Sequence, residues 1–87
     1  MKIDYDTLLG FIPRDADREK LSGLSKQLFE SELARESAEP TERSAADSRR
    51  AALLDQLTET IQWHFRAARR PMPTHEEISE MVKEHFQ

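Results

Sequence analysis

The 87-residue chain has no cysteine, two glycines and four prolines. Without cysteine there is no disulfide framework, no thiolate nucleophile and no cysteine-containing zinc site. The shortage of glycine excludes phosphate-cradling glycine loops and argues against a turn-rich β protein. No apolar run approaches the roughly 18 residues of a membrane span, so we expect a cytoplasmic protein that does not act at a membrane.

Acidic residues outnumber basic ones, 17 to 13, and give a net charge of −4. A negative field repels polyanions, so we expect nucleic acid not to be a partner. The charge is unevenly spread, because residues 60–73 hold three arginines and no acid, whereas residues 74–87 hold four glutamates and one lysine. A basic segment therefore precedes an acidic C-terminal segment.

Hydrophobic periodicity predicts an all-α fold, a small bundle of three or four helices that forms a single domain over residues 1–87. The expected helices cover residues 4–12, 15–35, 45–69 and 74–86. In the first helix, apolar residues recur at helical spacing from Tyr5 to Ile12, after a possible cap at Asp4 and before Pro13. An edge strand over residues 2–5 is the alternative. The last helix begins with a Thr-x-x-Glu capping box, Thr74 and Glu77.

Residues 35–50 contain no large apolar side chain and include a proline, Pro40. Such a segment adds nothing to a hydrophobic core, so we expect a mobile linker or a frayed helix start. A cap at Thr41 or Ser44 would extend the third helix backwards. Helical from Glu42, that helix would span about 43 Å. A domain of this length is only about 30 Å across, so the helix must overhang, break or pack in a dimer.

Trp63 is the most informative single residue. It lies about 140° from the centre of the third helix's apolar stripe, bordered by Arg49, Arg66 and Arg70. One interpretation is a partner-binding surface, since Trp and Arg dominate the energetic centres of interfaces. The alternative is that the third helix is central and Trp63 belongs to its second buried face. The candidate partner-binding residues are Trp63, Arg66, Arg70, Arg69 and Arg49.

The arginine cluster and the three histidines have more ordinary explanations as well. Arginines could bind phosphate or carboxylate groups, but cations at a helix C-terminus also complement the helix dipole. His64, His75 and His85 show no i, i+4 spacing, and no Glu-x-x-His occurs, so we expect no metal. Serines at helix-surface spacing, with no glycine turn to present a nucleophile, lead us to expect no cofactor and no enzymatic activity.

The segment from Arg70 to Met81 resembles the proline-threonine entry into the first helix of helix-turn-helix modules, such as those of sigma factors and winged-helix repressors. The resemblance implies a basic recognition helix in the major groove. Here the helix after Thr74 is acidic, so we do not transfer that function. If the third helix took this role, Arg49, Arg50, Arg66 and Arg70 would have to face DNA.

These patterns predict a non-catalytic protein-binding module. We expect a small acidic regulator or inhibitor that occupies the surface of a protein partner, of the general type found among antitoxins, anti-CRISPR proteins and anti-activators. The alternative is a small dimeric DNA-associated transcriptional regulator that uses the arginines around the third helix. A third possibility is a structural subunit, a homodimer whose partner is a second copy of itself.

Overall fold

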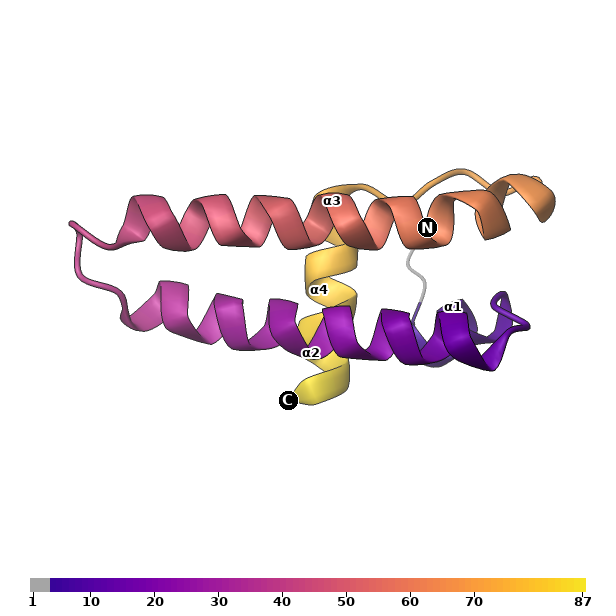
Figure 1. Ribbon diagram of the computed structural model, residues 1–87, viewed down its shortest axis with the longest axis horizontal. Helices are drawn as coiled ribbons and strands as arrows, with labels where there is room; N and C mark the ends of the chain where they lie inside the picture. The colour runs from indigo at the N-terminus through magenta and orange to yellow at the C-terminus, as the bar shows by residue number, and fades with distance from the viewer. Residues whose placement is uncertain (1–3) are drawn as a thin grey trace.

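The chain folds into four α-helices in a computed structural model that describes residues 4–87 (Figure 1). The helices are α1 (Tyr5–Gly10), α2 (Asp15–Ser37), α3 (Arg43–Ala67) and α4 (His75–Phe86), and there is no strand within residues 4–87. The all-α prediction is confirmed, and every helix boundary lies within two residues of the predicted one. Tyr5 begins α1 rather than ending a strand, and residues 2 and 3 lie outside the described residues.

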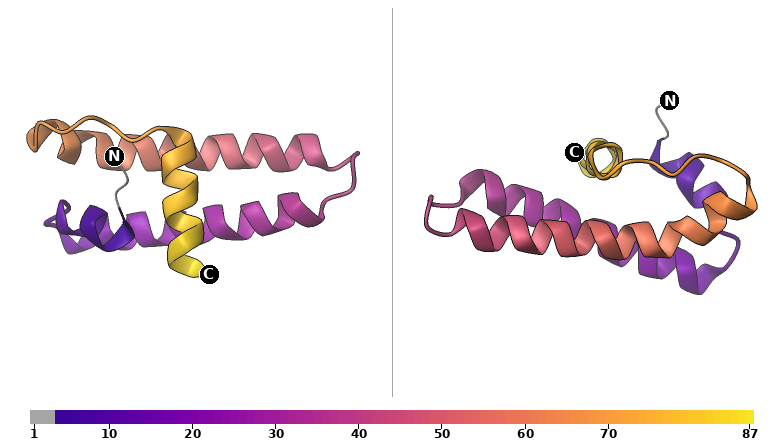
Figure 2. Two further views of the ribbon diagram at one scale, coloured as in Figure 1. Left: turned by 180° about the vertical axis from the view of Figure 1, so that it is seen from behind. Right: turned by 90° about the horizontal axis from the view of Figure 1, so that it is seen from above.

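Two long helices form an antiparallel hairpin, and the two shorter ones cover one side of it. In Figure 1, α2 and α3 run side by side and α4 crosses both of them at a steep angle. The view from above in Figure 2 places α1 and α4 on the same side of the hairpin. Within residues 4–87, no other helix covers the opposite side or the outer edge of the hairpin.

The length of α3 makes the molecule elongated. Its 25 residues span about 38 Å at 1.5 Å per residue. The molecule measures 42 × 22 × 20 Å, so α3 runs along nearly the whole long axis. Of the three outcomes expected for a long third helix, the structure shows the overhang, because the hairpin tip extends well beyond α4 (Figure 1).

The core lies where the hairpin meets α1 and α4. It is built from the apolar stripes that the periodicity predicts, and Ile12, Leu28, Ile61 and Val82 are fully buried. The remaining members are Tyr5, Leu8, Leu21, Leu24, Leu53, Leu54, Leu57, Phe65, Ile78 and Met81. None of the described helices is both long and apolar enough to span a bilayer.

Two helix starts follow directly from local sequence. The carboxylate of Asp4 accepts a hydrogen bond from the Thr7 backbone N–H at 2.7 Å, and hydrogen bonding to Thr7 lowers the pKa of Asp4. The capping box is complete: Glu77 N–H donates to the Thr74 hydroxyl at 3.2 Å, and Thr74 N–H donates to the Glu77 carboxylate at 3.1 Å. The hydrogen bonds that the Glu77 carboxylate accepts from Thr74, the backbone one first, lower the pKa of Glu77. They satisfy backbone N–H groups that a helix start leaves without partners.

The predicted linker, residues 35–50, forms the tip of the hairpin. Both ends of this segment are helical, and only residues 38–42 connect α2 to α3. Arg35 donates to Asp47 at 2.6 Å across the tip. Between the two helices a pocket of about 180 Å³ is lined mainly by alanines, because this segment has no large side chain to fill it. Its mobility stays a prediction.

Candidate functional site

Trp63 points away from the core, on the outer face of α3. Its side chain is 71% exposed, whereas Ile61 and Phe65 on the inner face are buried. The interpretation of Trp63 as part of a second buried face is therefore wrong for the single chain. Within residues 4–87, Leu33 on α2 is the other large hydrophobic residue that is exposed, at 48%.

A hollow of about 270 Å³ opens beside the indole. It is lined by Trp63, Arg66 and Ala67. Residues three and four positions apart lie next to each other on a helix surface, so Arg66 and Ala67 both flank Trp63. The small side chain of Ala67 leaves the space open on one side of the ring, and the guanidinium of Arg66 supplies a fixed positive charge. The surface thus combines an exposed aromatic ring, a hollow and a cation.

The chain turns away from this surface directly after α3. Arg69 has a φ of 54°, in the left-handed region, and the Arg70 N–H donates to the Phe65 carbonyl at 3.0 Å. This bonding pattern ends a helix and reverses the chain direction. As a result the Arg70 guanidinium lies 5.0 Å from the centre of the Phe11 ring, which packs against Phe65. The structure brings Arg66 to Trp63 but places Arg70 toward the connection between α1 and α2.

Arg49 is exposed on α3, but it lies far from Trp63 along the helix axis. Fourteen residues separate the two, which corresponds to about 21 Å. Arg49 borders a second hollow of about 230 Å³, between α2 and α3, that is lined also by Gln27, Glu30, Ser31 and Leu53. The five candidate residues therefore do not form one contiguous patch, and Trp63 and Arg66 are the pair that the fold brings together.

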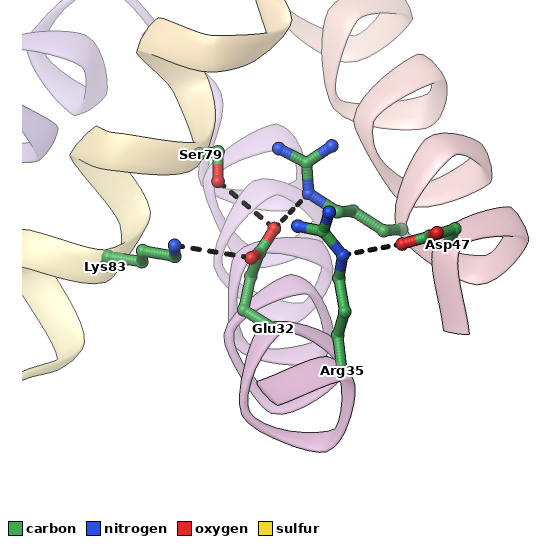
Figure 3. Close-up of polar contacts among 6 residues, drawn as sticks. Glu32, Arg35, Asp47, Ser79 and Lys83 are labelled. Carbon is green, nitrogen blue, oxygen red and sulfur yellow. Dashed lines mark hydrogen bonds and ion pairs between the residues drawn. The ribbon is translucent and has the colours of Figure 1, made fainter. Parts of the chain in front are cut away.

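A buried carboxylate, which the sequence analysis missed, joins three helices. The side chain of Glu32 on α2 is 3% exposed and accepts a hydrogen bond from Arg50 of α3. The Ser79 hydroxyl of α4 donates to Glu32 at 3.1 Å, and Lys83 of α4 lies 3.4 Å from its second oxygen. Figure 3 shows Ser79 and Lys83 approaching Glu32 from one side. These contacts stabilise the packing of α4 against the hairpin of α2 and α3.

Opposing influences set the ionisation of Glu32. Burial is the largest and raises the pKa of the carboxyl, because a low-dielectric surrounding disfavours the charged form. The hydrogen bond and charge of Arg50, the charge of Lys83 and the hydrogen bond from Ser79 act together in the other direction. Together these three residues outweigh the effect of burial and hold the pKa of Glu32 below its usual value. The residue is therefore a buried, fully paired carboxylate.

A sequence signal for this cluster existed. Glu32 lies four residues after Leu28, and Arg50 lies four residues before Leu54, so both charges occupy positions on the apolar stripes of their helices. Two opposite charges on facing stripes indicate a buried ion pair, since unpaired charges are rarely buried. Which helices face each other depends on the tertiary fold, so the signal becomes specific only with the hairpin pairing known.

The histidines lie apart from one another and do not converge on a site. His64 lies 3.9 Å from Asp17, His75 lies 3.4 Å from Asp55, and the ring of His85 stacks on Tyr5 with centres 4.1 Å apart. Within the part of the chain that the structure describes, no group of three or more His, Asp or Glu residues is placed to hold a metal ion.

No protein-family model, curated protein or solved structure matches this chain.

Proposed function

We propose that the protein is a non-catalytic protein-binding module of the cytoplasm, a small acidic regulator or inhibitor that acts by occupying the surface of a partner protein. The contact is centred on Trp63 and Arg66 of α3. Arg49, about 21 Å from Trp63 along α3, lies outside this contact.

The observation that carries the proposal is the 71% exposure of Trp63. A tryptophan left in water gains about 1.5–3 kcal/mol or more when a partner buries it. The neighbouring hollow at Ala67 gives a partner side chain room to pack against the ring, and Arg66 adds a charged anchor. Because the core is built on the opposite face of α3, nothing in the packing of the single chain requires a large aromatic residue at this position.

Arg69 supports the same interpretation. A side chain at positive φ costs about 1–2 kcal/mol, and glycine is the ordinary residue at such a helix end. An exposed arginine at a φ of 54° is consistent with a guanidinium that is used in binding.

The experiment compares capture of partners from cells of the natural source by three tagged proteins: wild type, Trp63→Ala and Leu33→Ala. Leu33 is the matched control, because it is the other large exposed hydrophobic residue of the described chain and lies on α2. We expect one protein to be recovered in stoichiometric amount with wild type and Leu33→Ala. We expect it to be lost with Trp63→Ala, whose affinity should fall by about 2 kcal/mol or more.

Circular dichroism and thermal unfolding of both variants show whether folding is intact. Trp63→Ala should retain the helicity and melting temperature of wild type, since its side chain is outside the core. Equal recovery of the protein by all three baits would contradict the proposal. Recovery of nucleic acid that is released steeply by added salt would replace it with the DNA-associated regulator.

A further inference from the structure

Two charged residues of opposite sign flank Trp63 on the outer face of α3. Glu59 lies four residues before Trp63 and Arg66 three residues after it, and all three side chains are exposed. Glu59 and Arg66 are seven residues apart, so their directions around the helix axis differ by only about 20° and both lie on one stripe of the helix surface. Neither makes an ion pair with another residue in the described part of the chain.

This arrangement is complementary to itself. If a second α3 lies antiparallel against the first, with the two-fold axis close to Trp63, then Glu59 of each copy stands opposite Arg66 of the other. A two-fold interface requires this reciprocity: if Glu59 of the first copy contacts Arg66 of the second, then Arg66 of the first copy contacts Glu59 of the second. The two tryptophans then meet next to the axis.

We propose that a second copy of this chain docks on the outer face of α3, with Trp63 against Trp63 of the second copy and two reciprocal Glu59–Arg66 ion pairs around them. The hollow at Ala67 is where the indole of the second copy packs. Trp63 is 71% exposed, and no other helix within the described residues covers the outer edge of the hairpin (Figure 2), so the approach is open.

The contact is small, because one helix face from each copy supplies it. Interfaces below about 1,200 Å² are typical of weak and transient assemblies. We therefore expect a dissociation constant between about 1 μM and 1 mM. A weak dimer has a consequence that rests on the proposed function: the second copy and the partner protein compete for Trp63, so self-association regulates access to that surface.

Charge reversal and sedimentation equilibrium of the purified chain test the dimer. Glu59→Arg leaves this stripe with positive charges only, and Arg66→Glu leaves it with negative charges only. We expect each variant alone to self-associate at least about tenfold more weakly than wild type, because like charges then face each other. An equimolar mixture of the two variants should recover association, and so should a single chain that carries both reversals.

Two further variants complete the design. Trp63→Ala should also weaken self-association about tenfold or more, by loss of the central contact. Lys26→Glu and Glu36→Arg, which reverse exposed charges on α2, are the matched controls and should leave association unchanged. Recovery in the mixture demonstrates that the single variants are folded, so a loss of association is not a loss of structure.

The inference is overturned if wild type is monomeric up to about 1 mM, or if its association is insensitive to both reversals. It fails independently of the proposed function. If Trp63→Ala loses the cellular partner and wild type is monomeric, the dimer proposal is wrong and the proposed function stands. If self-association responds to the charge reversals as expected but partner capture is insensitive to Trp63→Ala, the proposed function is wrong and the dimer proposal stands.

Discussion

Replacing Glu32 by glutamine removes the negative charge at the junction of α2, α3 and α4 while it keeps the size of the side chain. Arg50 and Lys83 then lose the carboxylate that both approach, and Ser79 keeps a hydrogen-bond acceptor in the amide oxygen. We expect Glu32→Gln to destabilise the fold substantially, because it leaves two cations without a counter-charge in a poorly solvated position.

The magnitude follows from burial. Removing one member of a fully buried ion pair costs about 3–5 kcal/mol. Glu32 is 3% exposed, but the side chains of Arg50 and Lys83 are 22% and 36% exposed and can recover part of their hydration. We therefore expect a loss of about 2 kcal/mol, below the range for a fully buried pair. A loss of this size lowers the melting temperature of a domain this small by roughly 8–16 °C.

Thermal unfolding at neutral pH, followed by circular dichroism, measures this loss. Asp47→Asn is the matched control, because it breaks the Arg35–Asp47 pair, whose side chains are 42% and 50% exposed. An exposed pair contributes about 0–1 kcal/mol, so this variant should melt within a few degrees of wild type. The reasoning is refuted if Glu32→Gln lowers the melting temperature no more than Asp47→Asn does.

Acid adds a second test of the same residue. The folded-state pKa of Glu32 lies below the usual 4.5, so the unfolded chain binds its proton more readily than the folded chain. Its contribution to stability is therefore complete above about pH 4.5 and is lost as the pH falls through the folded-state pKa. The difference in melting temperature between wild type and Glu32→Gln should narrow on acidification. Asp4 and Glu77 also have lowered pKa values. Both residues are present in both proteins, so their effects on the melting temperature cancel in this difference.

Three further substitutions have defined outcomes in urea denaturation. Arg69→Gly should stabilise the fold by about 0.5–1 kcal/mol, because glycine adopts a positive φ without steric cost; a loss of stability would contradict this. Thr74→Ala removes the capping hydroxyl of α4 and should cost about 1 kcal/mol, and an unchanged midpoint would argue against the cap. Ser25→Ala should be neutral or stabilising by up to about 1 kcal/mol, since the buried hydroxyl has no hydrogen-bond partner in residues 4–87; a marked destabilisation would show that it has one.

Local sequence accounts for most of the secondary structure. Asp4, Thr74 and Glu77 start helices with side chains that lie within three residues of the N–H groups they satisfy. Pro71 and Pro73 follow the end of α3. These signals act over less than one helical turn, so they can be found without knowing the fold. The periodicity of the apolar residues likewise specifies which face of each helix is buried.

The same periodicity leaves the candidate site undecided. It places Trp63 opposite the core stripe of α3, but a helix can be covered on one face or on two, and only the positions of the other helices distinguish these cases. Arg70 illustrates a related limit. An ideal helix extended through residue 70 puts Arg70 on the same face as Trp63, two turns further along. The left-handed residue Arg69 instead turns Arg70 onto Phe11.

What the sequence by itself determined is the set of helices, their boundaries within two residues and the face that each one buries. The tertiary structure decided what lies outside that face. Exposure of Trp63 depends on whether another helix covers the outer side of α3, and the pairing of Glu32 with Arg50 depends on which stripes meet across 18 residues of chain. Helix formation is governed by neighbours within about four residues, whereas coverage and charge pairing are governed by segments that become neighbours only when the hairpin closes and α4 crosses it.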